Sequence, residues 1–314
     1  MKKLVSIMIP TFNRANLVDG AIESALAQDY GNLEVLVSDN GSTDNTAEVV
    51  GSFASDTRLR YVRYPENIGS AANFNNALMQ HARGEYVLML CDDDRLTDKS
   101  YISKAMRLIE SDQEVVLVFA NYRIMDLATQ TVLGETRIAL QPNAIIEGRW
   151  LWLNYWQGII CGLLTTLYSR KIGMQVGGYI LETMGSDTLL ALNILLHGKG
   201  GFIADVVADY NVHSASDTKM TRDMGVLYRG MDWIRAGGNY ACRKGIAEDE
   251  VRSWKKRLLT VLLTEYVHDP CLLELAKGNR QPLKKLLSMA KEYGEQDCLL
   301  EAMASMLNAV LGKL

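Results

Sequence analysis

The chain has 314 residues and a formal net charge of −4, and 48% of the residues are hydrophobic and 22% charged. These values are typical of a soluble globular protein, and the length suffices for one large or two ordinary domains. No apolar run reaches the roughly 18 residues that a membrane span needs. The apolar run near the N-terminus is also too short for a signal peptide.

The cysteine spacing indicates the cellular compartment, and the distribution of charge indicates the kind of binding partner. The five cysteines have no spacing typical of metal sites or redox motifs, which predicts a reducing, cytoplasmic compartment. Residues 1–218 contain 17 basic and 25 acidic residues, whereas residues 219–314 contain 16 and 12. An acidic body suits a site for metal and phosphate, and a basic tail suits an anionic neighbour. Nothing here indicates binding to nucleic acid.

The first 122 residues alternate between short apolar runs and stretches with apolar residues every three or four positions. The runs predict strands, and the spaced stretches predict amphipathic helices. Strands are expected at 4–9, 33–38, 59–63, 86–90 and 115–122. Helices are expected at 16–28, 70–82 and 98–110, with another that is capped within 42–46 and runs through 50. This alternation predicts βαβ units and a mostly parallel sheet flanked by helices.

Polar segments follow the first four predicted strands, at residues 10–14, 39–42, 67–69 and 92–94. In parallel sheets, ligands bind beyond the carboxyl ends of the strands, so these segments predict an active site. The last segment consists of three adjacent aspartates. Clustered carboxylates repel one another unless a cation compensates their charge, and Mg²⁺ and Mn²⁺ prefer oxygen ligands.

The remainder of the chain is less regular until its last third. Residues 131–149 are predicted to be irregular or hairpin-like, and residues 150–156 contain three of the five tryptophans. That aromatic segment favours core packing, with a stacking platform for a sugar ring as the alternative. From about residue 220 the apolar spacing is helical to the end, which predicts a helical appendage.

Four motifs in a fixed order carry a resemblance to a known family. They are VSIMIPTFNR at 5–14, SDNGSTD at 38–44, NIG at 67–69, and the segment from Gly84 to the aspartates at 92–94. Together they closely resemble glycosyltransferase family 2 over about residues 4–216. The resemblance implies a GT-A-type, Rossmann-like α/β domain at 1–218, followed by the helical region at 219–314. It also implies an inverting sugar transferase that uses a nucleotide sugar and Mn²⁺ or Mg²⁺.

The resemblance also implies roles for individual residues. Asp39 matches the acid that binds the nucleotide base, and Asp187 matches the general base that deprotonates the acceptor hydroxyl. The metal set is Asp93, Asp94 and His213. The remaining nucleotide-binding residues are Pro10, Thr11, Asn13, Arg14, Asn67, Gly69, Asn75, Asp92 and Asp93.

The resemblance to the family does not settle the alignment of the aspartates or the role of Asp187, and the sequence departs from the family pattern at two positions. The family's Asp-x-Asp signature aligns either Cys91 with the first acid and Asp93 with the metal ligand, or Asp92 and Asp94 with the two acids. Asn40 stands where a second acid is common, and Phe74 stands where many members have Arg. Asp187 could instead act only as a helix cap.

Two other classes of function would also place a nucleotide site on such a fold. A sugar-phosphate nucleotidyltransferase would normally carry a glycine-rich loop after the first strand, which residues 10–14 lack. A non-catalytic protein that binds sugar nucleotides on the same fold is the third class. A UDP-sugar is the default donor, and the acceptor is a glycan or lipid-linked hydroxyl. The basic tail suits either peripheral contact with the inner membrane surface or homo-oligomer packing.

Overall fold

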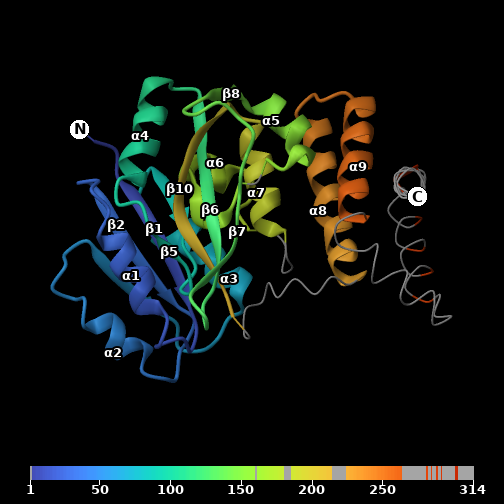
Figure 1. The fold of residues 1–314 in the computed structure, drawn as a ribbon. Helices are drawn as coiled ribbons and strands as arrows, with labels where there is room; N and C mark the ends of the chain where they lie inside the picture. Colours follow the sequence, from blue (N-terminus) through green and yellow to red (C-terminus); the bar gives the residue numbers. More distant parts are fainter. Residues whose placement is uncertain are drawn as a thin grey trace.

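The computed structural model describes residues 2–159, 161–179, 185–213 and 224–263, and the single residues 281, 284, 288, 291, 301 and 302. A mixed sheet with strand order β3-β2-β1-β4-β9-β6-β10-β5 lies at its centre, with helices on both faces (Figure 1). The predicted boundary at residue 218 and most of the chain beyond residue 263 lie outside the described residues. The predictions of membrane contact and homo-oligomer packing concern the basic tail at 219–314, and they therefore fall largely outside the described residues.

The first half of the sheet is parallel, as the sequence predicts. Strands β1 and β2 are buried along their whole length, which is why they read as continuous apolar runs. The parallel strands are β1 (Val5–Thr11), β2 (Leu33–Asp39), β3 (Leu59–Arg63) and β4 (Tyr86–Met89). The helices between them are α1 (Val18–Leu26), α2 (Thr46–Gly51) and α3 (Ser70–Asn76), which continues into the π-helical turn η1 (Ala77–His81).

The second half of the sheet mixes directions. Strand β9 (Thr166–Ser169) lies antiparallel between β4 and β6 (Val115–Asp126), and β10 (Lys199–Val212) runs parallel to β6. Short strands β5 (Arg95–Leu96) and β8 (Ile145–Glu147) pair with β10. Strand β7 (Thr131–Glu135) forms a hairpin with β6, in agreement with the hairpin-like prediction for this region.

Side chains of the sheet alternate between two hydrophobic cores, because successive residues of a strand point to opposite faces. Val5, Ile7 and Ile9 pack with α1 and with α4 (Tyr101–Ser111), whereas Met8 packs with residues of η1 and α7. The helices that follow β7 are α5 (Gly148–Asn154), α6 (Arg170–Gln175) and α7 (Ser186–Leu195), with the 3-10 turns η2 (Tyr155–Gln157) and η3 (Leu163–Thr165).

Two further helices, α8 (Met224–Arg243) and α9 (Glu248–Leu262), pack side by side against α7 and α5 (orange in Figure 1). The Trp152 ring stacks on the Trp254 ring with centroids 4.0 Å apart and planes 18° apart, so α9 is fixed to α5. The core-packing interpretation of the aromatic segment therefore holds for Trp152. Within the described part of the chain, no helix is both long and apolar enough to cross a membrane.

Trp254→Ala is expected to lower the free energy of unfolding by about 3–5 kcal/mol, because it removes a fully buried ring and leaves a cavity. Denaturant unfolding measures the loss. Trp150→Ala is the matched control, because the Trp150 side chain is 44% exposed and its removal should change stability by less than about 0.5 kcal/mol. Equal losses in the two variants would contradict the packing described here.

Candidate active site

The ends of β1, β2 and β4 bring three of the predicted segments to one edge of the sheet. In the β1–β2 pairing, Pro10 lies opposite Ser38 and Thr11 opposite Asp39. Strand β4 runs parallel on the other side of β1, so the aspartates that follow it lie at the same edge. The topology alone therefore places Thr11, Asp39 and the aspartate loop side by side.

Asp39 is fully buried at the end of β2 and is held by several donors. Its carboxylate accepts hydrogen bonds from the Ser42 N–H at 2.8 Å and from the Tyr61 hydroxyl at 2.5 Å. The Arg63 guanidinium lies 3.8 Å from the same carboxylate. Burial, together with the hydrogen bond to Asp39, raises the pKa of Tyr61. Tyr61 therefore stays a neutral donor, and it fixes the orientation of an acid that can still accept further hydrogen bonds.

Loops 11–15 and 40–46 are joined by hydrogen bonds, two of which involve Asn13, a residue predicted to bind the nucleotide. The Asn13 backbone N–H donates to Ser42 Oγ at 2.9 Å, and Asn13 Oδ1 accepts from the Thr43 N–H at 2.7 Å. Asp44 accepts from the Ala15 N–H at 3.1 Å. Asn13 therefore shapes the loop beside Asp39, and its amide oxygen is already engaged.

Asn40 connects the loop after β2 to the loop after β3. Its amide donates to Asn67 Oδ1 at 3.1 Å and accepts from the Ile68 N–H at 2.8 Å. Asn67 Oδ1 also accepts from the Gly69 N–H at 2.8 Å. A carboxylate at position 40 could accept from Ile68 but could not donate to Asn67. The pairing with Asn67 therefore gives a physical reason for the amide at position 40.

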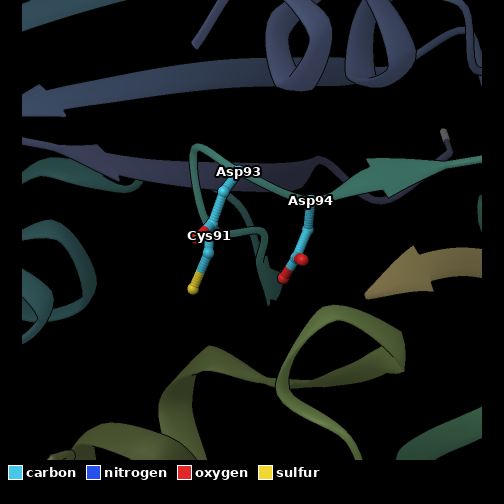
Figure 2. Close-up of side chains that lie close together, drawn as sticks. All are labelled: Cys91, Asp93 and Asp94. Atoms are coloured by element: carbon cyan, nitrogen blue, oxygen red, sulfur yellow. The ribbon is translucent and has the colours of Figure 1, made fainter. Parts of the chain in front are cut away.

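The three aspartates lie on the loop after β4, where Figure 2 shows Cys91, Asp93 and Asp94 close together. Asp93 Oδ2 accepts from Arg14 Nη1 at 2.7 Å and lies 3.0 Å from His213 Nε2. Asp92 Oδ1 lies 3.3 Å from the same Arg14 nitrogen. Arg14 and His213 therefore come from opposite ends of the domain sequence to meet at Asp93.

Asp94 has a different environment from its neighbours. Its Oδ1 accepts from the Asn211 N–H at 2.9 Å, and the Asn211 side chain donates to the Asp93 carbonyl at 2.6 Å. Asn211 thus holds the aspartate loop against the end of β10, two residues before His213. Ligand atoms of Cys91, Asp93 and Asp94 lie within 4.8 Å of one another. Two carboxylates at this spacing, with a nearby imidazole, fit a divalent metal ion.

Burial of these acids makes their negative charge costly. Burial raises the pKa of Asp92 to about 6, against the lowering effects of the Thr11 hydroxyl and Arg14. Burial and the neighbouring Asp93 charge raise the pKa of Asp94 well above its usual range. Burial, followed by the charges of the aspartates, raises the pKa of the Cys91 thiol. A bound cation would offset this cost.

In the metal-free protein, Asp94→Asn is expected to raise the free energy of unfolding at neutral pH, because burial and the neighbouring Asp93 charge raise the pKa of Asp94. A carboxylate whose pKa is raised on folding destabilises the folded state when it is ionised, and this penalty shrinks as pH falls from the raised pKa to the ordinary pKa of the unfolded chain. The amide removes this penalty and keeps an acceptor for the Asn211 N–H. Thermal melting in EDTA measures the effect.

Two controls accompany this experiment. Asp56→Asn should have the opposite sign, because hydrogen bonds from Arg58 lower the pKa of Asp56 to about 2. Adding Mn²⁺ should raise the melting temperature of the wild type more than that of Asp94→Asn. A lower melting temperature of Asp94→Asn in EDTA would contradict the electrostatic account.

Asp187 lies in the first turn of α7, and Gly185 rather than Ser186 or Asp187 is the N-cap residue. Gly185 therefore occupies the N-cap position, whereas Asp187 lies in the first turn, where the helix dipole also favours an acid. Burial raises the pKa of Asp187, while backbone N–H groups of the first turn oppose the rise. Its charge in turn helps to raise the pKa of Cys91 and of Cys161. Asp187 thus lies within electrostatic reach of the aspartate loop, and it lines a small cavity with Cys161, Tyr168 and Tyr179.

Asn75 contacts the segment that precedes Asp187. Its Nδ2 donates to the Tyr179 carbonyl at 2.6 Å, and its Oδ1 accepts from the Tyr179 N–H at 2.8 Å. The Phe74 ring meets the Tyr179 ring edge-on, with centroids 5.5 Å apart. Asn75 was predicted to contact the nucleotide. In the structure, both polar atoms of its side-chain amide are hydrogen-bonded to the Tyr179 backbone. Phe74 thus adds an aromatic contact with Tyr179 next to the two hydrogen bonds of Asn75.

Several residues of the site escaped the sequence analysis. Tyr61 lies within a correctly predicted strand, but nothing in its local pattern marks it as the partner of Asp39. Asn211 lies two residues before His213, and Tyr179 lies eight residues before Asp187, but no local pattern marks either as a residue of the site. The contacts of these three residues join segments far apart in the chain.

Comparison with known proteins identifies the family. The model of the family described as Glycosyl transferase family 2 matches residues 6–171, more than half of the chain. The chain belongs to glycosyl transferase family 2. This confirms the predicted family and the enzyme class, a glycosyltransferase. Of the predicted site residues, Asp187 and His213 lie beyond the matched segment of this family 2 chain.

Similar proteins with names agree with this assignment. Glycosyltransferase GlyG of Streptococcus pneumoniae is 33% identical over 118 residues, which are 37% of this chain and 39% of GlyG. A Campylobacter jejuni enzyme, GalNAc(5)-diNAcBac-PP-undecaprenol beta-1,3-glucosyltransferase, is 44% identical over 98 residues, 31% of each chain. The matches span less than two-fifths of these relatives, so they support the class of enzyme and leave its substrates open.

Solved structures share the fold of this family 2 chain. S. aureus TarS 1–349 in complex with UDP-GlcNAc aligns with a TM-score of 0.67 and 16% identity, over 98% of this chain and 81% of that one. Mannosyltransferase PcManGT from Pyrobaculum calidifontis, in complex with GDP-Man and Mn²⁺, aligns with a TM-score of 0.58 and 19% identity, over 98% and 88%. These alignments confirm the GT-A-type α/β fold.

Proposed function

We propose that this protein is an inverting, metal-dependent glycosyltransferase that moves a sugar from a nucleoside diphosphate sugar to an acceptor hydroxyl. The observation that carries the proposal is the joining of Arg14, Asp93 and His213 at one edge of the sheet, with Asp187 within electrostatic reach. Such a site combines a place for a diphosphate and its cation with a separate carboxylate to serve as base.

The nucleotide would lie across the ends of β1 and β2. Asp39, held by Tyr61 and Ser42, would accept a hydrogen bond from an N–H of the base. The loop at 67–69, fixed by Asn40, would lie beside the base and ribose. UDP is the first donor nucleotide to test, because a UDP-GlcNAc complex is known for TarS, and the GDP-Man complex of PcManGT makes GDP the second.

The metal would be held by Asp93, Asp94 and His213, and when bound it supplies Lewis-acid stabilisation of the departing diphosphate. Arg14, which contacts Asp92 and Asp93, adds positive charge at the same place. We favour Mn²⁺ over Mg²⁺, because the proposed ligands include the His213 imidazole and Mg²⁺ is the harder ion. The Mn²⁺ in the PcManGT complex supports this choice.

Asp187 would accept the proton of the acceptor hydroxyl as its oxygen attacks the anomeric carbon. The bond to the diphosphate oxygen breaks on the opposite side of that carbon, so a single displacement inverts its configuration. The acceptor would be a hydroxyl of a glycan or a lipid-linked glycan, and the undecaprenol-linked substrate in the name of the Campylobacter relative supports including lipid-linked acceptors.

Turnover of UDP-, dTDP- and GDP-sugars with Mn²⁺, Mg²⁺ or EDTA tests the proposal. We expect release of the nucleoside diphosphate from one donor class, with metal only. Release of pyrophosphate from a sugar phosphate and a nucleoside triphosphate would identify a nucleotidyltransferase instead. Binding of a nucleotide sugar without turnover, with simple sugars or lipid-linked glycans as acceptors, would identify a non-catalytic protein.

A further inference from the structure

An aromatic ring of the C-terminal helices covers the start of the helix that carries Asp187. Gly185, the N-cap residue of α7, has a φ of +97°, a conformation that glycine adopts readily. A Cβ on Gly185 would come within 2.3 Å of Trp233 Cδ1 and 3.0 Å of its Cγ and Nε1. The indole of α8 therefore packs directly on the backbone two residues before Asp187.

The Trp233 ring is itself held in place by other rings. It is buried, and it meets the Trp254 ring at 76° with centroids 6.4 Å apart. Trp254 stacks in turn on Trp152 of α5. The three tryptophans thus connect α5, α9 and α8 to the first turn of α7 through rigid side chains.

The spacing between α8 and α7 is short along this contact. A Cβ on Gly237, one turn after Trp233, would lie 3.3 Å from the Trp254 ring and 3.5 Å from Leu189 of α7. Glycine weakens a helix interior by about 1 kcal/mol. Its presence here is consistent with a close approach of the two helices, and that approach keeps the Trp233 ring against Gly185.

From these contacts we infer that Trp233 is a positioning residue for the general base. The ring fixes where α7 begins, and the first turn of α7 fixes the Asp187 carboxylate relative to the aspartate loop. Helices α8 and α9 are then part of the catalytic unit, although they lie beyond the segment that the family model matches. The inference rests on the proposed role of Asp187.

The test compares Trp233→Leu and Trp233→Phe with the control Ile234→Ala. Ile234 is the next residue of α8, is also buried and belongs to the same hydrophobic cluster, but it is not the residue that covers Gly185. Trp233→Leu is expected to lower kcat about 10- to 100-fold, the scale of a small misplacement of a reacting group. The dissociation constant for UDP with Mn²⁺, measured by calorimetry, should change less than about twofold.

The controls separate positioning from stability. Trp233→Phe keeps a ring over Gly185 and should restore most of kcat, whereas Ile234→Ala should lower the melting temperature without a matching loss of kcat. Hydrogen exchange of the amides at 186–190 should be faster in Trp233→Leu than in Ile234→Ala. Unchanged kcat and exchange in Trp233→Leu, or equal changes in Ile234→Ala, would overturn the inference.

A double variant distinguishes this inference from the proposed function. In an Asp187→Asn background, Trp233→Leu should cause little further loss of kcat, because its effect acts through the missing carboxylate. If Asp187→Asn itself leaves kcat unchanged, the proposed base is wrong. If Asp187→Asn lowers kcat and Trp233→Leu does not, only the positioning role is wrong.

Discussion

Asp187→Asn is expected to lower the rate of sugar transfer by about 10²- to 10⁴-fold, the usual contribution of a general base. The amide keeps the size of the side chain but cannot accept the hydroxyl proton. The affinity for UDP with Mn²⁺ should stay within about twofold, because Asp187 lies on α7 and the proposed nucleotide site lies on the loops after β1, β2 and β4. Steady-state kinetics and calorimetry measure the two quantities separately.

The pH dependence of kcat is a second test of the role of Asp187. Burial raises the pKa of Asp187, and a base must be ionised to act, so wild-type kcat should fall as pH drops through that raised pKa. The residual activity of Asp187→Asn should lack this acidic limb. Asp205→Asn is the control, because Asp205 is an exposed acid paired with Lys104 far along β10 and should leave the profile unchanged. The profile is measured at saturating Mn²⁺, so that protonation of Asp92 and Asp94 does not limit the rate through loss of the metal, and an acidic limb that persists in Asp187→Asn under these conditions would assign the base to another group.

Asp93→Asn is expected to remove the dependence of UDP affinity on Mn²⁺ and to lower kcat/KM by about 10³-fold, since a metal contributes several kcal/mol of charge stabilisation. Asp93 is the acid that both Arg14 and His213 contact. Asn there could still accept a hydrogen bond but would bring no negative charge to a cation.

Asp92→Asn is the matched comparison, because Asp92 contacts Arg14 at 3.3 Å and is not one of the three clustered ligand residues. It should weaken UDP binding modestly and keep the Mn²⁺ dependence. A comparison of Asp93→Asn with Asp94→Asn decides the register of the Asp-x-Asp signature. Loss of the Mn²⁺ dependence in Asp94→Asn, with its retention in Asp93→Asn, would favour the Asp92-x-Asp94 alignment instead.

The parts of the fold that could be predicted depend on local patterns. Strands β1, β2, β3 and β4 have continuous or alternating apolar residues and short polar loops, and their observed bounds differ from the predicted ones by only one or two residues. The loops that follow parallel strands must lie at one sheet edge, so the neighbourhood of Asp39 and the aspartates could be derived from sequence.

The second half of the sheet could not be derived in this way. Strand β10 begins with Lys-Gly-Gly and changes register with β6 near Ile203 and Val206, so its alternation of apolar residues is interrupted. Strand β9 has only four residues and lies antiparallel between two longer strands. Such pairing depends on partners distant in the chain, which leave little local signal.

The side-chain contacts within the site could not be predicted for the same reason, because they join residues that are distant in the chain. Asn75 and Tyr179 are 104 positions apart, and Asn211 and Asp94 are 117 apart. The sequence indicated which residue types gather at the site, but the fold determines which of them hold one another. Asn40 illustrates this, because its departure from the usual acid is explained only by its contact with Asn67.

A crystal structure with UDP and Mn²⁺, with manganese located by anomalous scattering, would show where the nucleotide and the metal bind. We expect the uracil base against Asp39 and manganese coordinated by Asp93, with His213 beside it. We also expect the diphosphate to lie between the aspartate loop and Asp187. A nucleotide bound away from the ends of β1, β2 and β4, or manganese bound without Asp93, would contradict the proposed site.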